Sequence, residues 1–255
     1  MIVLPLVELA EGQTMVFQFD VLKINFKIKY IKMKNYLLLI IILFAFNSCT
    51  VENDNINVIG CKNCTGSEIK ICNQIWMTKN LDVLLYKNGD TIRHAQTQSE
   101  WQDANTKQQG AWCYYDNDYN NSCKYGKLYN WFAVNDTRGI APAGWHIPTV
   151  AEWIELFNCL GGADVACGKL KEAGIENWAN PNNGATNESG FTALPGGYRY
   201  FDGVFHNFGG YGYFWTSSEN NATTAFSNHL YFDRISILST ISFKGDGQSV
   251  RCVKD

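Results

Sequence analysis

Apolar residues recur at helical spacing between residues 149 and 160, and this is the clearest secondary-structure element in the sequence. The residues that would share its buried face are Val150, Trp153, Ile154, Phe157 and Leu160. Thr149 and Glu152 form a capping box at its start, because each side chain can accept a hydrogen bond from the other residue's backbone N–H. Gly161 and Gly162 end the helix.

Three shorter helices are predicted from the same kind of spacing. One covers residues 97–104 with Ser99 as its N-cap, and another covers residues 127–134. The third covers residues 165–172, with Asp164 as its cap. All of these helices lie before the last strands of the chain.

Alternating apolar and polar residues predict short strands before and after these helices. Residues 68–79 fit two strands joined by a turn, and residues 111–115 fit another. Beyond residue 196, turns alternate with strand patterns, beginning with a hairpin at Asp202-Gly203. We therefore expect one α+β domain over residues 67–255. In it, two or three short helices would pack on twisted antiparallel strands built largely from residues after 196.

The most hydrophobic stretch lies near the N-terminus, where residues 36–46 read YLLLIIILFAF after Lys32 and Lys34. A basic segment followed by a short apolar core is typical of a secretory signal peptide, and the core is shorter than the roughly 20 residues that span a bilayer. Ser48 and Cys49 resemble the lipobox of bacterial lipoproteins, in the loose form common in Bacteroidetes. This implies cleavage before Cys49 and its lipidation. A buried anchor helix is the alternative.

This interpretation divides the N-terminal part into three segments. Met33 is a normal start for such a signal peptide, so residues 1–32 would lie upstream of the true start. Residues 33–49 would form the signal peptide, and residues 50–66 a polar tether. We therefore expect an exported protein that a lipid holds in a membrane, with the outer membrane, facing the periplasm or the cell surface, as the expected site.

Eight cysteines remain after Cys49, and an even number in an exported chain predicts disulfides. Two local pairings are geometrically simple. Cys159 would pair with Cys167 across a Gly-Gly turn, and Cys113 with Cys123 across a polar loop. The pairing of the others stays open, and these are Cys61, Cys64, Cys72 and Cys252. The first two form a CxxC that could bind metal, although no second CxxC follows it.

Charge and composition narrow the class of partner. The chain has 21 basic and 24 acidic residues, a net charge of −3. It has no basic stripe that could meet phosphates, so we do not expect nucleic acid as a partner. Aromatic residues make up 14% of the chain, and all eight tryptophans lie beyond residue 75. This part of the chain therefore has the apolar surface to form a core.

Six sequence blocks occur in a recognisable order. They are NQIWM (73–77), GKLYNW (126–131), GWHIPTVAEW (144–153), GFTALPGGYR (190–199), FWTSSE (214–219) and SVRCVKD (249–255). Together they resemble the Fibrobacter succinogenes major paralogous domain, over about residues 68–255. That family is common in exported proteins of Fibrobacteres and Bacteroidetes. Its activity is unassigned, so the resemblance implies a domain and an exported setting but no ligand.

A wider likeness links HIPTVAEW at 146–153 with the LPTEAEWE segment of formylglycine-generating enzymes. It implies a single, disulfide-linked domain of the C-type-lectin-like fold. The oxidases of that group use two neighbouring cysteines near the C-terminus, whereas this chain has Cys252 alone there. Their chemistry is therefore not expected here, since fold likeness does not carry function.

A long polar loop and the aromatic strands after it form the candidate binding region. The polar candidates are Asn182, Asn183, Asn187 and Glu188. Of these, the oxygen atoms of Asn182, Asn187 and Glu188 could hold Ca²⁺, but the same residues also suit turns. The aromatic candidates are Tyr198, Tyr200, Tyr211, Tyr213 and Trp215. Their rings could stack on sugars or pack in the core.

Two classes of function follow. The favoured one is a non-enzymatic binding or adhesion module anchored in the envelope, with an extracellular glycan or protein as its ligand. The alternative is an exported enzyme, either a divergent relative of formylglycine-generating enzymes or a hydrolase with scattered active-site residues. A pocket that brings His146 or His206 against a carboxylate or a free thiol would favour the enzyme.

Overall fold

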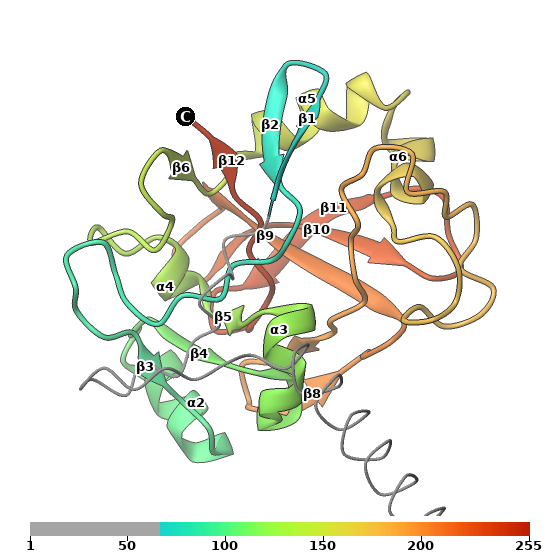
Figure 1. Ribbon diagram of the computed structural model, residues 1–255. Coiled ribbons are helices and arrows are strands. Elements are labelled where there is room, and N and C mark those ends of the chain that lie inside the picture. The colour runs from blue at the N-terminus through green and yellow to red at the C-terminus, as the bar shows by residue number, and fades with distance from the viewer. Residues whose placement is uncertain (1–66) are drawn as a thin grey trace, which may run out of the picture. The chain divides into compact units, whose positions relative to one another are not determined.

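The computed structural model describes residues 67–255, which lie within one compact unit of the chain (Figure 1). The helices are α2 (Gln98–Thr106), α3 (Ser122–Tyr125), α4 (Trp131–Val134), α5 (Val150–Cys159) and α6 (Ala163–Leu170), with 3₁₀ turns η1 (Tyr115–Asn117) and η2 (Tyr119–Asn121). The strands are β1 (Glu68–Ile71), β2 (Gln74–Met77), β3 (Arg93–His94), β4 (Ala111–Cys113), β5 (Leu128–Tyr129), β6 (Trp145–His146), β7 (Tyr198–Arg199), β8 (Phe205–His206), β9 (Tyr211–Glu219), β10 (Thr224–Tyr231), β11 (Leu238–Phe243) and β12 (Val253–Lys254). This confirms the α+β class.

The strands form several small sheets. Their orders are β1-β2-β12-β6, β11-β10-β9, β3-β4-β5 and β7-β8. Among the strand pairs formed by residues 67–255, β3 with β4 is the one that runs parallel. The antiparallel strands expected after residue 196 are those of the second and fourth sheets. In the first sheet, Val253 lies between Trp76 and His146, so the last strand joins the beginning of the described region to its middle.

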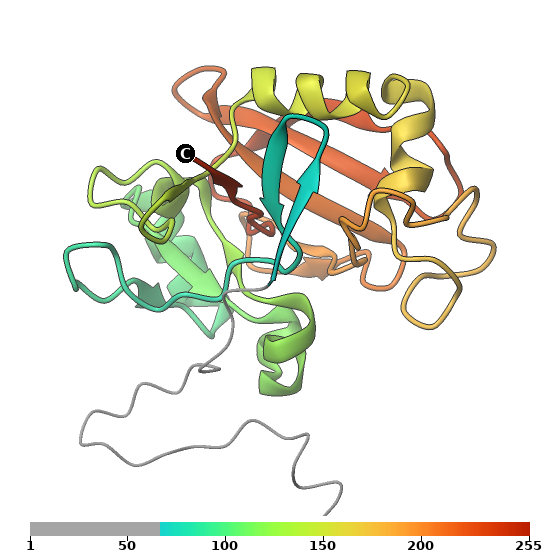
Figure 2. The ribbon, with the colours of Figure 1, turned by 45° about the horizontal axis from the view of Figure 1, so that its top comes forward.

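Helix α5 has the start that the sequence predicts, but its buried face differs in part: Trp153 and Phe157 are buried as expected, whereas Leu156 is buried in place of Ile154, which is 48% exposed. Thr149 Oγ1 accepts a hydrogen bond from the backbone N of Glu152 at 3.3 Å, and the Glu152 carboxylate accepts one from the backbone N of Thr149 at 2.7 Å. Trp153 and Phe157 turn inward, and the ring of Trp153 lies 5.9 Å from that of Phe214 in β9. Figure 2 shows α5 lying along one face of the β11-β10-β9 sheet.

Other helices begin at different residues than expected. Residues 127–134 split into β5 and α4, because the side chain of Asn130 caps α4. Helix α2 begins after Thr97, which forms a capping box of its own, and Ser99 is not the cap. Helix α6 begins earlier than predicted, with Asp164 inside its first turn and not at its cap.

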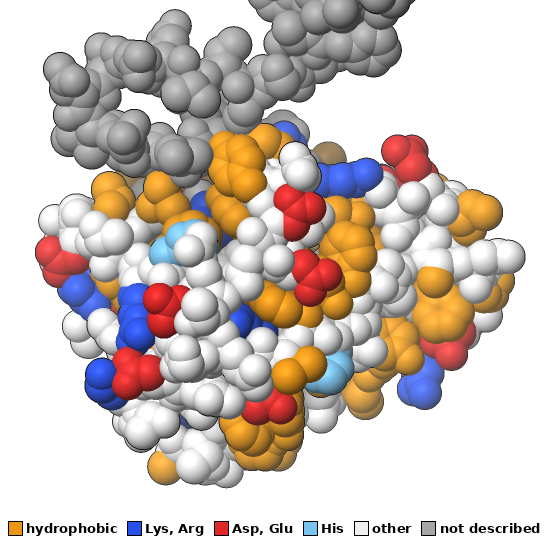
Figure 3. Space-filling model, turned by 90° about the horizontal axis from the view of Figure 1, so that it is seen from below, with side chains coloured by type: hydrophobic (Ala, Val, Ile, Leu, Met, Phe, Trp, Pro, Cys, Tyr) orange, Lys and Arg blue, Asp and Glu red, His pale blue; other side chains and the backbone are white. Residues whose placement is uncertain are grey.

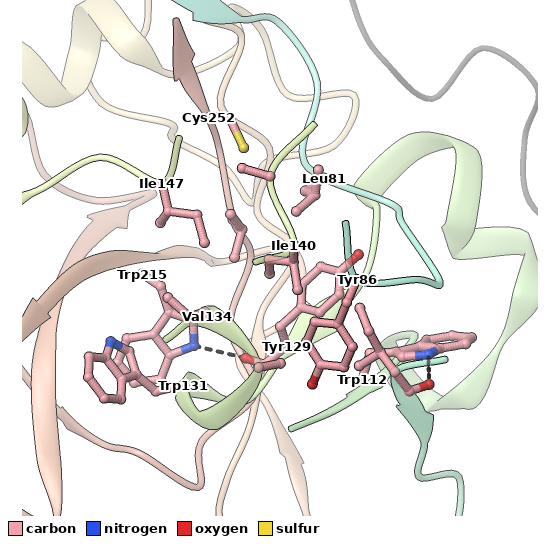
Figure 4. Packing of buried hydrophobic residues seen from close by; sticks show 14 of the residues in the cluster. Leu81, Tyr86, Trp112, Tyr129, Trp131, Val134, Ile140, Ile147, Trp215 and Cys252 are labelled. Carbon is pink, nitrogen blue, oxygen red and sulfur yellow. Dashed lines mark hydrogen bonds between the residues drawn. The ribbon is translucent and has the colours of Figure 1, made fainter. Parts of the chain in front are cut away.

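The core is rich in aromatic rings whose polar atoms bond to the backbone. Figure 4 shows one cluster of it, in which Trp215 Nε1 donates to the carbonyl of Tyr129 at 2.8 Å. In the same cluster, Trp112 Nε1 donates to the carbonyl of Ile92 at 3.1 Å. Satisfying these indole donors lets tryptophan side chains be buried without an unpaired polar group.

Both predicted disulfides are wrong. Cys159 is bonded to Cys72, with their Cα atoms 6.5 Å apart, so the link joins the β1–β2 turn to the end of α5. Cys167 is a free thiol because it lies on the face of α6 that packs into the core. Cys113 is likewise a buried free thiol, and Cys123 is bonded to a different cysteine. Closeness in sequence did not predict which way these side chains point.

The predictions for the N-terminal part lie outside the described residues. They concern the upstream segment 1–32, the signal peptide 33–49 with Cys49, and the tether 50–66. The pairing of Cys61 and Cys64 lies outside them too. In the part of the chain that the structure describes, no helix is long and apolar enough to cross a membrane.

Candidate functional site

The face of the β11-β10-β9 sheet that α5 leaves uncovered carries a set of aromatic rings. Alternation along β9 places Tyr211 and Tyr213 on this face, and the antiparallel register sets Tyr231 and His229 of β10 opposite them. The ring centroids are 4.6 Å apart for Tyr211 and Tyr231, and 4.4 Å apart for Tyr213 and His229. Such cross-strand ring contacts hold the side chains in defined positions.

The β7-β8 hairpin extends this set of rings. The ring of Tyr198 lies 4.6 Å from that of Tyr213, and the ring of His206 lies 5.4 Å from that of Tyr198. Tyr200 follows, with its ring 6.2 Å from that of His206. We call these seven residues the aromatic face, and they are Tyr198, Tyr200, His206, Tyr211, Tyr213, His229 and Tyr231.

Gly197 allows the hairpin to approach the sheet closely. It forms a bridge with Gly212 of β9 and has a φ of +61°, which favours glycine. A Cβ atom at this position would lie 2.6 Å from the carbonyl oxygen of His206. A larger residue would therefore clash with β8 within the hairpin and with the ring of Tyr115, and would distort the hairpin that carries Tyr198 and His206.

Four tyrosine hydroxyls on the aromatic face are available to a ligand. Within residues 67–255, the hydroxyls of Tyr198, Tyr200, Tyr211 and Tyr231 make no hydrogen bond, and these residues are half-buried. Tyr213 is buried, and its hydroxyl accepts a hydrogen bond from Asn207 Nδ2 at 2.6 Å. Figure 3 views the molecule from the side on which β8 lies and shows hydrophobic side chains gathered there, with a histidine beside them.

The aromatic face carries little charge at neutral pH. Burial lowers the pKa of His229 to about 4, so its imidazole is neutral, and its Nε2 lies 2.9 Å from Ser227 Oγ. Burial also raises the pKa values of Tyr198 and Tyr213, so both phenols stay protonated. Rings and neutral hydroxyls therefore make up the aromatic face, which suits an uncharged ligand, and at the Tyr231 end the guanidinium of Arg234 lies over the ring, 4.8 Å from its centroid.

The asparagine-rich loop borders the aromatic face but uses two of its amides internally. The backbone N of Asn183 donates to the carbonyl of Phe232 at 2.7 Å, which holds the loop beside the end of β10. The side chain of Asn183 donates to the carbonyl of Asp233 at 2.9 Å. Asn182 is buried and donates to the carbonyls of Glu172 and Gly174. The side-chain amides of Asn182 and Asn183 therefore hold the loop in shape. This agrees with the alternative that these residues serve the turns of the loop.

The three residues predicted to hold Ca²⁺ have separate contacts. Asn187 Nδ2 donates to Thr192 Oγ1 at 2.9 Å, and Glu188 lies 3.4 Å from Lys169 Nζ. Asn182 Oδ1 is buried and accepts no hydrogen bond within the described residues. Calcium binding stays a prediction, and the contacts of these side chains do not by themselves make an oxygen cage.

Of the predicted aromatic candidates, Tyr198, Tyr200, Tyr211 and Tyr213 come together on the aromatic face. Trp215 does not present its ring to a ligand, because it is fully buried in a core cluster with Tyr129 and Trp131. The sequence-based list missed three members, which are His206, His229 and Tyr231. The alternation in SNHLY (227–231) was the pattern that could have indicated two of them.

His146 lies between two carboxylates at the junction of β6, β12 and α5. Its Nδ1 is 2.7 Å from Asp255 Oδ1, and its Nε2 is 2.6 Å from Glu152 Oε1. Burial alone would lower the pKa of His146, but the hydrogen bonds to the two carboxylates outweigh it and raise the pKa. Both ring nitrogens are engaged, so the arrangement holds three elements together and leaves neither nitrogen open to a substrate.

The free cysteines Cys113, Cys167 and Cys252 are all buried. Burial raises the pKa of each thiol, to about 12 for Cys113 and Cys252. A protonated, buried thiol is a poor nucleophile. His146 does lie against two carboxylates, which is part of the observation named above as favouring an enzyme, but both of its ring nitrogens are bonded to them. The enzyme alternative stays a prediction.

Comparison with known proteins adds one match. Residues 69–254, which include α5 and the whole aromatic face, match the model of the Fibrobacter succinogenes major domain. No curated protein and no solved structure matches the chain. Since this one domain model accounts for most of the sequence, the chain belongs to the Fibrobacter succinogenes major domain family.

Proposed function

We propose that this domain is a binding module whose aromatic face receives a neutral, polyhydroxylated ligand, namely a carbohydrate. The observation that carries the proposal is the set of neighbouring rings from Tyr231 to Tyr200, together with four tyrosine hydroxyls that make no internal hydrogen bond in the described region. Rings offer flat apolar surface to the C–H faces of a sugar, and free hydroxyls can both donate and accept hydrogen bonds.

The scaffold beneath the aromatic face supports this role. Most of its rings project from paired strands, and strands hold side chains more firmly than loops do. Tyrosine has few rotatable bonds, so little conformational entropy is lost when a ligand fixes it. The asparagine-rich loop lies beside one end of the aromatic face, where it would limit how far a ligand extends.

The setting of this module follows the sequence-based expectations. A lipid on Cys49 and a polar tether would hold the domain at an envelope surface, where capture of glycans or adhesion is useful. The C-type-lectin-like arrangement also stays a prediction, since no solved structure matches the chain.

Binding of neutral oligosaccharides to wild-type and variant proteins tests the proposal. Titration calorimetry with cellohexaose, xylohexaose and mannohexaose should detect binding of at least one. Tyr198→Ala and Tyr211→Ala should each weaken it by about tenfold, as expected when an interface aromatic is truncated. Tyr211→Phe keeps the ring, so it should lose only the contribution of the hydroxyl.

Tyr119→Ala is the matched control, because Tyr119 is an exposed tyrosine in η2 and not part of the aromatic face. Each titration is repeated with Ca²⁺ and with a chelator. Equal losses for Tyr119→Ala and Tyr211→Ala would argue against the aromatic face as the site. Binding that requires Ca²⁺ would instead assign the site to the asparagine-rich loop.

A further inference from the structure

Strand β11 is an open edge of its sheet. Within residues 67–255, no strand or bridge pairs with the side of β11 that faces away from β10. Its sequence LSTISF has no charged residue and no proline, and its register with β10 has no bulge. Leu238, Ile241 and Phe243 are 41%, 50% and 45% exposed. Edge strands usually carry charged residues, proline or a bulge that prevents pairing with another strand, and β11 carries none of these.

A groove with a volume of about 460 Å³ runs beside this edge, between α5 and strands β10 and β11. Ile154 of α5, Phe226 of β10 and Ile241 of β11 line it, and Ile154 is 48% exposed. Phe226 and Ile241 are opposite each other in the β10–β11 register. The described residues that line the groove include no charged side chain. A strand added outside β11 would cover these apolar side chains.

We propose that β11 pairs with β11 of a second copy of this chain, antiparallel, so that two sheets of three strands become one of six. Charge is the reason for choosing a second copy as the partner. A two-fold interface sets the same patch against itself, and any charge on the patch would then repel its own copy. β11 and the groove beside it are uncharged, so the patch can meet itself without that cost.

The symmetry limits the possible registers. A two-fold axis normal to the sheet requires opposite residues to share a face, so a residue can oppose itself or one that lies an even number of positions away. The register centred on Ile241 sets Ile241 against its own copy and Thr240 against Ser242. The register centred on Thr240 sets Ile241 against Ser239. The first buries more apolar surface and joins Ile241 and Ile154 of both copies in one apolar strip.

The same axis does not turn the sheet over, so the aromatic faces of both copies would point to the same side of the dimer. If the aromatic face binds carbohydrate as proposed above, a polymer with repeated units could engage both copies at once and gain avidity. This consequence rests on the proposed function, whereas the pairing of β11 does not.

Cysteine cross-linking tests the pairing and its register together. In the full chain, purified in mild detergent, Ile241→Cys should form a disulfide-linked dimer under mild oxidation. Opposite Cα atoms in an antiparallel pair lie about 4.5 to 5.5 Å apart, within the range that a disulfide spans. Thr240→Cys tests the other register, and Ile175→Cys is the control because Ile175 is 60% exposed and lies outside the sheet. Ile241→Cys should yield several-fold more dimer than either.

Sedimentation equilibrium tests the association without an added cysteine. The unaltered chain should self-associate, and Ile241→Lys should weaken this by about tenfold or more, because two like charges would meet at the axis. Ile175→Lys should leave it unchanged. A chain that stays monomeric at high concentration would overturn the proposal, as would Thr240→Cys or Ile175→Cys linking as fast as Ile241→Cys. Oligosaccharide binding by the Ile241→Lys variant is measured separately, so a failure of the pairing is distinguishable from a failure of the aromatic face.

Discussion

The ammonium of Lys171 lies 3.0 Å from the carbonyl oxygen of Asn183, inside the loop that the sequence suggested as a calcium site. It also donates to the carbonyls of Tyr231 at 2.9 Å and Arg234 at 3.1 Å, and its side chain is fully buried. Three carbonyl acceptors match the three donors of an ammonium group. Lys171 therefore supplies a positive charge within this loop and ties the loop to the end of β10.

We expect Lys171→Met to destabilise the domain by about 2–4 kcal/mol, because methionine fills similar space but leaves three buried carbonyls without their donor. Urea unfolding at constant pH measures the difference. Lys169→Met is the control, since Lys169 lies in the last turn of α6, two residues before Lys171, and its ammonium is 3.4 Å from the exposed carboxylate of Glu188. A Lys171→Met variant that is no less stable than Lys169→Met would show that the loop does not depend on this ammonium.

The Cys72–Cys159 disulfide closes a long loop, because its two cysteines are 87 positions apart in sequence. Replacing both cysteines with serine should lower the free energy of unfolding by about 3–5 kcal/mol, chiefly because the unfolded chain gains freedom. Unfolding of the variant and the parent is compared under non-reducing conditions. Mass spectrometry of an unreduced digest should find a peptide pair that contains Cys72 and Cys159. A pair that links Cys159 to Cys167 would contradict the structure.

Local patterns predicted the elements that depend on neighbours in sequence. The Thr149–Glu152 capping box involves residues three apart, and α5 begins where it predicted. The turn of the β1–β2 hairpin and the turn at Gly203 depend on local sequence in the same way. Residues of β9 were placed on the aromatic face by alternation alone, which is why Tyr213 was found from the sequence.

Contacts between distant segments could not be predicted in this way. Trp215 follows the same alternation as Tyr213, but the segment with Tyr129 and Trp131 buries it, and no pattern within β9 indicates that cover. The partner of Cys159 depends on the β1–β2 turn packing against α5, far away in sequence. Tyr231 joins the aromatic face only through the register between β9 and β10.

The His146 cluster should make stability depend on pH. The pKa of His146 is raised, so the folded state holds its proton more tightly than the unfolded state does. The resulting stabilisation is present in full below the ordinary histidine pKa of about 6.5 and is lost as pH rises through the higher folded value. His146 is 38% exposed at its side chain, so we expect no more than about 1 kcal/mol.

Urea unfolding of the parent and His146→Gln between pH 6 and pH 9 measures this effect. The parent should be the more stable at pH 6, and the difference should shrink toward pH 9. His94→Gln is the comparison, because burial lowers the pKa of His94, so the effect of that residue should have the opposite slope. A constant difference for His146→Gln would mean that the histidine packs against the carboxylates without an ionic contribution.

Asp246 should have a larger effect on stability in a lower pH range. The side chain is buried, and its two oxygens accept hydrogen bonds from the backbone N of Phe201 at 3.0 Å and of Phe243 at 3.2 Å. Burial raises its pKa to about 7 from the ordinary 3.8, and these two hydrogen bonds offset burial only in part. Between these values the folded state binds more protons than the unfolded state. The stability that the neutral carboxyl contributes is therefore lost as pH rises from about 4 to about 7.

Asp246→Asn stays neutral at every pH, so its stability should not fall over this range as that of the parent does. At low pH the parent should be the more stable by about 1 kcal/mol, because the asparagine amide group cannot accept one of the two backbone hydrogen bonds. Toward pH 8 the variant should draw level or become the more stable, since the parent must by then bury a charge. Urea unfolding at several pH values, with exposed Asp233→Asn as the control, measures the crossing. Parallel pH profiles for the parent and Asp246→Asn would show that the carboxyl is already ionised in the folded protein at low pH, stabilised by its two backbone donors.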